Sequence, residues 1–129
     1  MNLEKVVFGF FVLLAATLNM GFFVGDIARP ELHNIYELFA AVVVSLIATV
    51  LKFGDRTQIG AVHLATSLVA SLQLIAAAVV WTYAATVVSD GPLSMEQTSA
   101  VVSLSGGALF ANVVSVVLLV VETVSFQRR

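Results

Sequence analysis

The stretch TQIGAVHLATSLVASLQLIAAAVVWTYAATVVS, residues 57–89, contains no lysine, arginine, aspartate or glutamate. His63 is its one residue of a type that titrates near neutral pH. About 20 apolar residues in a helix cross the hydrocarbon core of a bilayer, so this stretch is long enough to span a membrane. We therefore expect a transmembrane helix over about residues 56–88.

Further runs with few or no charges lie on both sides of this stretch. Residues 6–25 and 97–121 are uncharged, whereas the strictly uncharged run of the remaining segment is shorter, residues 38–51. We expect helices over about 4–25, 30–53 and 95–125. Together with 56–88 they make an all-α membrane protein, a four-transmembrane-helix bundle that forms a single domain, residues 1–129.

The composition agrees with a chain that lies in lipid. Hydrophobic residues make up 60% of the chain and charged residues 11%, against roughly 25% charged in an ordinary soluble domain. A soluble protein of this size leaves about 30% of its surface exposed, too much to hide so many apolar side chains. The net charge of -2 does not indicate nucleic acid as a partner, and the absence of cysteine excludes disulfides and thiolate metal sites.

The positive charges indicate how the helices are oriented. All lysines and arginines except Arg29 fall in flanks that four spans place on one side: Lys5, Lys52, Arg56, Arg128 and Arg129. Cytoplasmic flanks carry an excess of lysine and arginine. We therefore expect both termini in the cytoplasm (N-in and C-in).

The connections carry recognisable turn residues. Lys52-Phe53-Gly54-Asp55-Arg56-Thr57-Gln58 predicts a tight helical hairpin, with Gly54 in a left-handed conformation and Asp55 capping the next helix. Ser94 and Gln97 predict a capping box at the start of the last helix.

Small and polar residues indicate which helix faces are buried, because helices in lipid associate through close packing and hydrogen bonds. On the second expected helix they form one stripe: His33, Glu37, Ala41, Ser45, Ala48 and Lys52. On the third they form another: His63, Ser67, Ala70, Ala77, Ala78, Trp81 and Ala85. We expect these two stripes to pack against each other.

The fourth expected helix has small or polar residues on two faces. One face holds Ser99, Ser103, Gly106 and Phe110, and the other holds Ser105, Ala108, Asn112, Ser115 and Glu122. We expect one face to contact its own bundle and the other a second copy in a homo-oligomer. Alternatively, both faces tune packing within one bundle.

Glu37 is the strongest candidate for a functional residue. If Lys52 reaches the cytoplasmic interface, Glu37 lies about one turn inside the outer boundary, since a helix rises about 1.5 Å per residue. Ionisable groups at that depth mark ion paths, proton relays or buried pairs. His33 shares its helical face, and the nearby acids complete an outer site that favours cations: Glu37, His33, Glu31 and Asp26. Alternatively, the helix dipole accounts for Glu31, and Glu37 pairs with Arg29 or lies in the headgroup layer.

Other polar residues within the spans have two interpretations. His63 can relay protons or bind a ligand, but a lone histidine also bonds a neighbouring helix. Amides likewise bond across helices or line ion pores. We interpret this group as helix-packing or pore-lining: Asn19, Ser45, His63, Ser67, Gln73, Ser103, Gly106 and Asn112.

No enzyme motif is present in the sequence. There is no phosphate-binding glycine loop, no G-x-S-x-G and no H-E-x-x-H. His33 and Glu37 offer two metal ligands at helical spacing, which is weak evidence without a third. We therefore expect neither catalysis, nor a cofactor, nor a metal site.

The second and third expected helices resemble a known family. The segments Glu37-Leu38-Phe39-Ala40, Lys52 to Thr57 and Ser71-Leu72-Gln73-Leu74 are similar to a family of small bacterial four-helix inner-membrane proteins of unknown function. The resemblance covers about a third of the chain and implies a multi-pass protein of the bacterial inner membrane, but no activity.

Two classes of function remain open. The first is a small homo-oligomeric ion channel or small-ion transporter that favours cations, whose partners are the lipid bilayer, other copies of the chain and small inorganic ions. The second is a non-transporting accessory or scaffold subunit of a larger membrane complex, bound to other membrane subunits. Neither class binds nucleic acid.

Overall fold

The computed structural model describes residues 3–25, 33–55, 57–88 and 93–127. These residues form helices and no strand: α1 (Leu3–Phe23), α2 (Ile35–Lys52), α3 (Gln58–Tyr83), the short π-helix η2 (Ala84–Val88) and α4 (Met95–Gln127).

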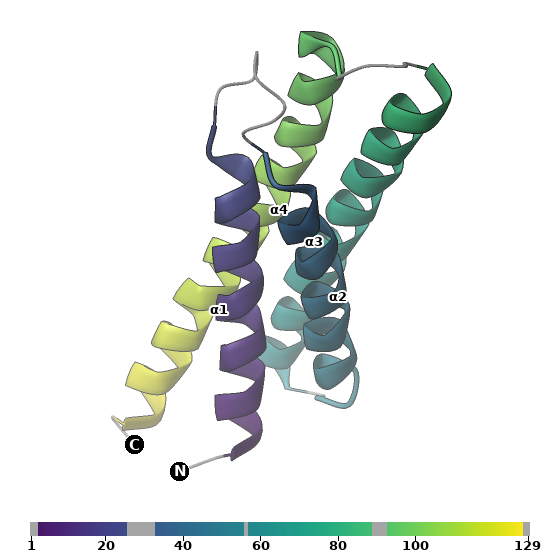
Figure 1. The fold of residues 1–129 in the computed structure, drawn as a ribbon. Helices are drawn as coiled ribbons and strands as arrows, with labels where there is room; N and C mark the ends of the chain where they lie inside the picture. Colours follow the sequence, from purple (N-terminus) through teal and green to yellow (C-terminus); the bar gives the residue numbers. More distant parts are fainter. Residues whose placement is uncertain (1–2, 26–32, 56, 89–92, 128–129) are drawn as a thin grey trace.

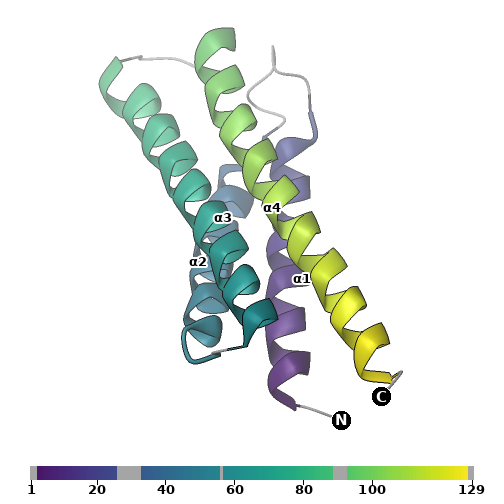
Figure 2. The same cartoon turned by 180° about the vertical axis from the view of Figure 1, so that it is seen from behind.

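The helices form a four-sided bundle in which α1 and α3 each pack against both α2 and α4. The beginning of α1 and the end of α4 lie at the same end of the bundle as the turn between α2 and α3 (Figures 1 and 2). We call this end, with Leu3, Gln127 and residues 53–57, the hairpin end. The far end is the one where α1 ends and α2 and α4 begin.

Four helices of the described chain are long and apolar enough to cross a membrane: Leu3–Phe23, Ile35–Lys52, Gln58–Val87 and Met95–Ser125. Their outward faces expose large apolar side chains, such as Phe10 on α1, Val50 on α2, Leu72 on α3 and Val120 on α4. Such faces are stable in a hydrocarbon solvent, because apolar side chains exposed to lipid carry no free-energy cost, whereas the same side chains exposed to water do. The fold is therefore that of an all-α, multi-pass membrane protein.

The second helix is shorter than the expected segment 30–53. It begins at Ile35, because Asn34 has extended backbone angles and its side-chain oxygen accepts a hydrogen bond from the Tyr36 N–H at 2.9 Å. This is the geometry of an N-cap residue. The other boundaries differ by at most two residues when η2, which extends α3 to Val88, is included.

The hairpin is built differently from the sequence-based prediction. Thr57, not Asp55, is the N-cap of α3, since its hydroxyl accepts from the Gly60 N–H at 3.0 Å. Asp55 instead accepts hydrogen bonds from the Thr57 hydroxyl (2.7 Å) and N–H (3.0 Å). The prediction of a left-handed Gly54 is wrong, because the chain leaves α2 through right-handed Phe53; among described residues positive φ occurs at Gly25.

The capping box at the start of α4 is confirmed. The Ser94 N–H donates to Gln97 Oε1 at 2.9 Å, and the Gln97 N–H donates back to Ser94 Oγ at 3.1 Å. These reciprocal bonds satisfy two N–H groups that a helix start leaves without partners.

Small side chains on the inner helix faces allow the helices to approach closely. Ala41 of α2, Ala70 and Ala77 of α3 and Ala108 of α4 are fully buried. They surround larger core residues such as Leu74. The packing of the small-residue stripes of α2 and α3 inside the bundle follows the pattern seen in the sequence, and dispersion contacts across these faces stabilise the bundle.

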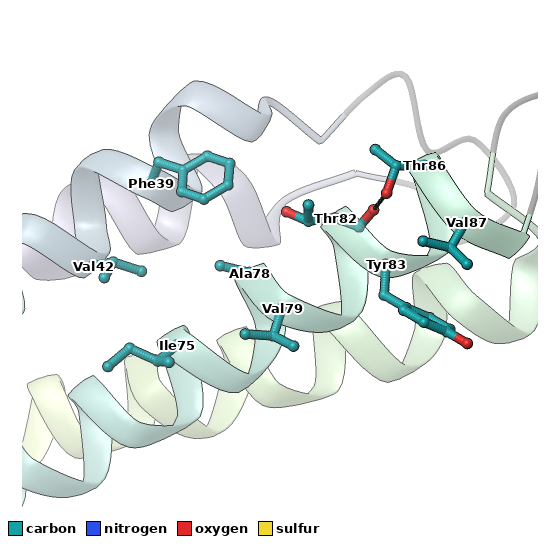
Figure 3. A pocket seen from close by; sticks show the side chains of 9 residues that line it. All are labelled: Phe39, Val42, Ile75, Ala78, Val79, Thr82, Tyr83, Thr86 and Val87. Carbon is teal, nitrogen blue, oxygen red and sulfur yellow. Dashed lines mark hydrogen bonds between the residues drawn. The ribbon is translucent and has the colours of Figure 1, made fainter.

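A groove of about 460 Å³ runs between α2 and α3 on the lipid-facing side (Figure 3). Its lining is almost entirely apolar: Phe39, Val42, Ile75, Ala78, Val79, Thr82, Tyr83, Thr86 and Val87. The Thr86 hydroxyl donates to the Thr82 carbonyl in its own helix. The groove thus offers no charged group that could hold an ion.

Candidate functional site

Glu37 lies in the first turn of α2, half-buried against α1. Its carboxylate occupies the space beside Gly21, where a β-carbon would overlap Glu37 Oε2. No hydrogen bond or ion pair joins this carboxylate to another residue that the structure describes. Gly21 therefore provides a notch that holds, between two helices, a carboxyl group without a partner among the described residues.

His33 does not share a helical face with Glu37 as predicted, because it precedes the Asn34 cap of α2. Its side chain is 3% exposed, and Nδ1 forms a hydrogen bond with the Phe22 carbonyl oxygen at 2.7 Å. Its ring also packs against the Phe22 ring, with centroids 5.5 Å apart. His33 thus ties the start of α2 to the end of α1. The other predicted members of the outer site, Asp26 and Glu31, lie outside the described residues.

Two buried hydrogen bonds connect neighbouring helices in the middle of the bundle. Ser105 Oγ of α4 donates to Asn19 Oδ1 of α1, and both side chains are fully buried. Thr49 of α2 and Ser71 of α3 bond through their hydroxyls at 3.1 Å. These are the interhelical bonds expected of polar residues in lipid, so Asn19 has at least a packing role.

The interior also contains polar atoms without partners. Within the part of the chain that the structure describes, these buried atoms make no hydrogen bond: Asn19 Nδ2, Ser45 Oγ, His63 Nε2, Gln73 Oε1, Thr98 Oγ1 and Asn112 Nδ2. They come from all four helices. Each unsatisfied buried group costs about 1–3 kcal/mol, and polar groups at membrane depth commonly mark an ion or substrate path.

Contacts between helices show where three of these atoms lie along the bundle axis. His63 is level with Ser115, because their side chains bond at 2.9 Å. Gln73 lies beside Gly107, where a β-carbon would overlap Gln73 Oε1. Asn19 is level with Ser105 and two residues from the Gly21 notch. The polar atoms are therefore spread from the hairpin end to the level of Glu37.

His63 is fully buried at the hairpin end, in contact with α1 and α4. Its Nδ1 bonds Ser115 Oγ of α4, and its ring meets the Phe8 ring of α1 edge-on with centroids 5.1 Å apart. Lys52 Nζ of α2 lies over the same Phe8 ring, 4.3 Å from its centroid. The Phe8 ring thus contacts both the imidazole and a cation.

Two ion pairs close the hairpin end. Lys5 Nζ of α1 lies 2.6 Å from Glu122 Oε2 of α4, and Lys52 Nζ lies 3.2 Å from Asp55 Oδ2 in the turn. The Lys52 side chain is only 6% exposed, so it turns into the bundle end, on the stripe of α2 that the sequence predicts to be buried. Hydrogen bonds from Thr57 and the neighbouring Lys52 lower the pKa of Asp55 to about 2.

The remaining predicted residues lie on different faces. Ser45, Ser67 and Asn112 are buried, whereas Ser103 is exposed. Gly106 is covered by its own chain, since a β-carbon there would lie 2.7 Å from Phe23 Cε2 of α1. The α4 stripe of Ser99, Ser103, Gly106 and Phe110 thus combines an intramolecular contact at Gly106 with three exposed residues.

Sequence analysis missed the Gly21 notch, the buried Thr98 and the Lys5–Glu122 pair. Lys5 and Glu122 carried the clearest signal, because opposite charges at the start of the first span and the end of the last must meet at one end of the bundle. Among the described residues there is no cluster of three or more His, Cys, Asp or Glu side chains that could hold a metal ion.

The fold and these groups define a class of protein: a multi-pass helical membrane protein with polar groups buried in its interior. Residues 32–123 match a family of unknown function (DUF6394), and the chain belongs to this family. The match continues beyond the second and third helices, on which the resemblance rests, through most of α4. No curated protein and no solved structure matches the chain.

Proposed function

We propose that the protein transports a small cation across the bacterial inner membrane, as a homo-oligomeric channel or transporter with both termini in the cytoplasm. The observation that carries this proposal is the set of unpartnered polar atoms inside an otherwise apolar bundle. Three of them, at Asn19, Gln73 and His63, lie between the level of Glu37, whose carboxylate has no partner in the described part of the chain, and the charged hairpin end. A purely structural bundle gains nothing from such groups, because apolar residues of similar size would pack without the desolvation cost.

The position of Glu37 supports cations as the transported species. Glu37 and Lys52 are separated by about 22 Å along α2, at about 1.5 Å per residue. This is less than the roughly 30 Å of the hydrocarbon core. With Lys52 at the cytoplasmic boundary, the carboxylate therefore lies inside the membrane, where a fixed negative charge attracts cations and repels anions. Asp26 and Glu31 belong to the proposed outer site by sequence alone, because they lie outside the described residues.

The oligomer is part of the proposal because one thin bundle is too narrow for a water-filled path. Ser99 and Ser103 support contacts between copies, since they are exposed on the outer face of α4. The same exposed serines favour the second candidate, an accessory subunit whose α4 docks on another membrane protein.

A pair of glutamate variants tests the transport function. Glu37 and Glu96 each lie in the first turn of a helix at the far end, but Glu96 is exposed whereas Glu37 sits in the Gly21 notch. In proteoliposomes, Glu37→Gln is expected to lower cation flux at least tenfold and Glu96→Gln to leave it within twofold. Equal flux from wild type and Glu37→Gln, with equal assembly, contradicts this role of Glu37.

A further inference from the structure

His63 stands out among the buried polar groups, because it combines a titratable ring with an unpartnered nitrogen. It is 0% exposed, and its Nε2 makes no hydrogen bond within the described chain. We infer that the transported ion is the proton and that His63 Nε2 is its acceptor at the hairpin end of the bundle. This inference rests on the proposed transport function and names its ion.

The proposed role needs one tautomer of the His63 ring. A neutral imidazole has one N–H donor and one acceptor. When Nδ1 donates to Ser115 Oγ, the Nε2 lone pair is bare and can accept a proton; when Ser115 donates to Nδ1, Nε2 carries the hydrogen and is a buried donor without an acceptor. Thr66 Oγ1 lies 3.2 Å from the same Ser115 oxygen and 2.9 Å from the His63 carbonyl oxygen, so its one proton does not fix which tautomer forms. In the first tautomer, which the proposed role requires, Nε2 is the free end of the ring.

The charged groups around His63 form two ion pairs, so no unpaired charge among the described residues favours or opposes protonation of the ring. Lys52 faces it from α2 and is paired with Asp55 of the turn. Lys5 faces the same end from α1 and is paired with Glu122 of α4. Lys5 and Lys52 thus each have a carboxylate partner, and the Phe8 ring contacts both Lys52 and the imidazole.

The interior suits a proton better than a metal cation. A sodium or potassium ion needs several oxygen ligands to replace its hydration shell. The interior groups are instead separate hydroxyls and amides, spaced along the axis at Asn112, Gln73 and Asn19. Amides do not relay protons themselves, but they can hydrogen-bond water molecules that pass a proton from one to the next, and Glu37 would be the carboxylate acceptor at the far end. The proton binds the Nε2 lone pair and leaves from the same nitrogen, so no other bond changes.

The first test measures proton entry into liposomes that contain the purified full-length protein and a trapped pH-sensitive dye, under an imposed membrane potential. His63→Gln keeps a side-chain amide that can bond Ser115 but cannot titrate. Thr123→Val is the matched control, because Thr123 is exposed and its hydroxyl bonds only the Leu119 carbonyl of its own helix. We expect proton flux to fall at least tenfold in His63→Gln and to stay within twofold in Thr123→Val. Undiminished flux in assembled His63→Gln overturns the inference.

Sodium and potassium flux from the same liposomes separates this inference from the proposed function. Metal-cation flux without proton flux leaves cation transport standing and overturns the proton. No flux of any ion overturns the proposed function itself.

A second measurement covers the case in which His63→Gln does not fold. The chain has two histidines, so nitrogen NMR of the wild-type protein in bilayers can assign both rings by difference from a His33→Asn sample. A protonation step at His63 Nε2 between pH 5 and pH 9 supports the inference. A ring that keeps one protonation state over that range overturns it.

Discussion

The carboxylate of Glu37 lies against Gly21 of the neighbouring helix, in space that any side chain at position 21 would fill. The position of a charged group in this bundle is thus set by an absent side chain on α1. The same packing arrangement, a polar side chain beside a glycine of another helix, recurs where Gln73 lies beside Gly107. Close approach at glycine is common between helices in lipid, but here it accommodates polar groups.

Replacing Gly21 by alanine should displace the Glu37 carboxylate. We expect cation flux to fall at least threefold and the free energy of unfolding in detergent to fall by about 1–3 kcal/mol, the usual effect of overpacking. Gly54→Ala is the control, since no atom lies within 4 Å of a β-carbon added there. Equal flux from both alanine variants would show that the notch does not position a functional carboxylate.

Two serines on α4 test which face of that helix is internal. Ser105→Ala removes the buried bond to Asn19 and should lower the free energy of unfolding by about 0.5–2 kcal/mol. Ser103→Ala, on the exposed face, should change it by less than about 0.5 kcal/mol. Chemical unfolding in mixed micelles measures both values. A larger loss for Ser103→Ala would contradict the packing described for α4.

The lowered pKa of Asp55 predicts how the free energy of unfolding depends on pH. Its pKa is about 2 in the folded protein and 3.8 ordinarily, so its contribution is fully present above pH 3.8 and is lost as pH falls towards 2. Asp55→Asn should therefore lower the free energy of unfolding at pH 7 by about 1–2 kcal/mol, a value reduced for partial exposure. The difference between wild type and variant should disappear near pH 2. A difference that is constant over this range would contradict the assigned role of Asp55.

The proposed orientation can be tested on a chain that has no cysteine of its own. Gly54→Cys in the hairpin turn should react with an impermeant maleimide only after cells are opened. Met95→Cys, exposed at the start of α4, should react in intact cells. The opposite labelling pattern would place the termini and the hairpin outside.

The sequence was sufficient to predict the helices, because uncharged runs and small-residue stripes are properties of whole segments. It was insufficient at single positions, where one capping bond decides where a helix starts or one contact decides where a side chain points. Asn34 starts α2 later than residue 30 and thereby turns His33 towards Phe22. Lys52 lies on the stripe expected to be buried, but its pairing with Asp55 and its position over the Phe8 ring could not be predicted from the sequence. Such contacts join residues from different helices, and periodicity along one helix carries no information about them.

The most direct test of the proposed function is ion flux from liposomes that contain only the purified, fully assembled protein, measured beside empty liposomes of the same lipid. We predict cation flux at least tenfold above the empty liposomes, with no anion flux above that background. Flux equal to that of empty liposomes, from protein shown to be folded and inserted, would contradict transport and favour the accessory-subunit alternative.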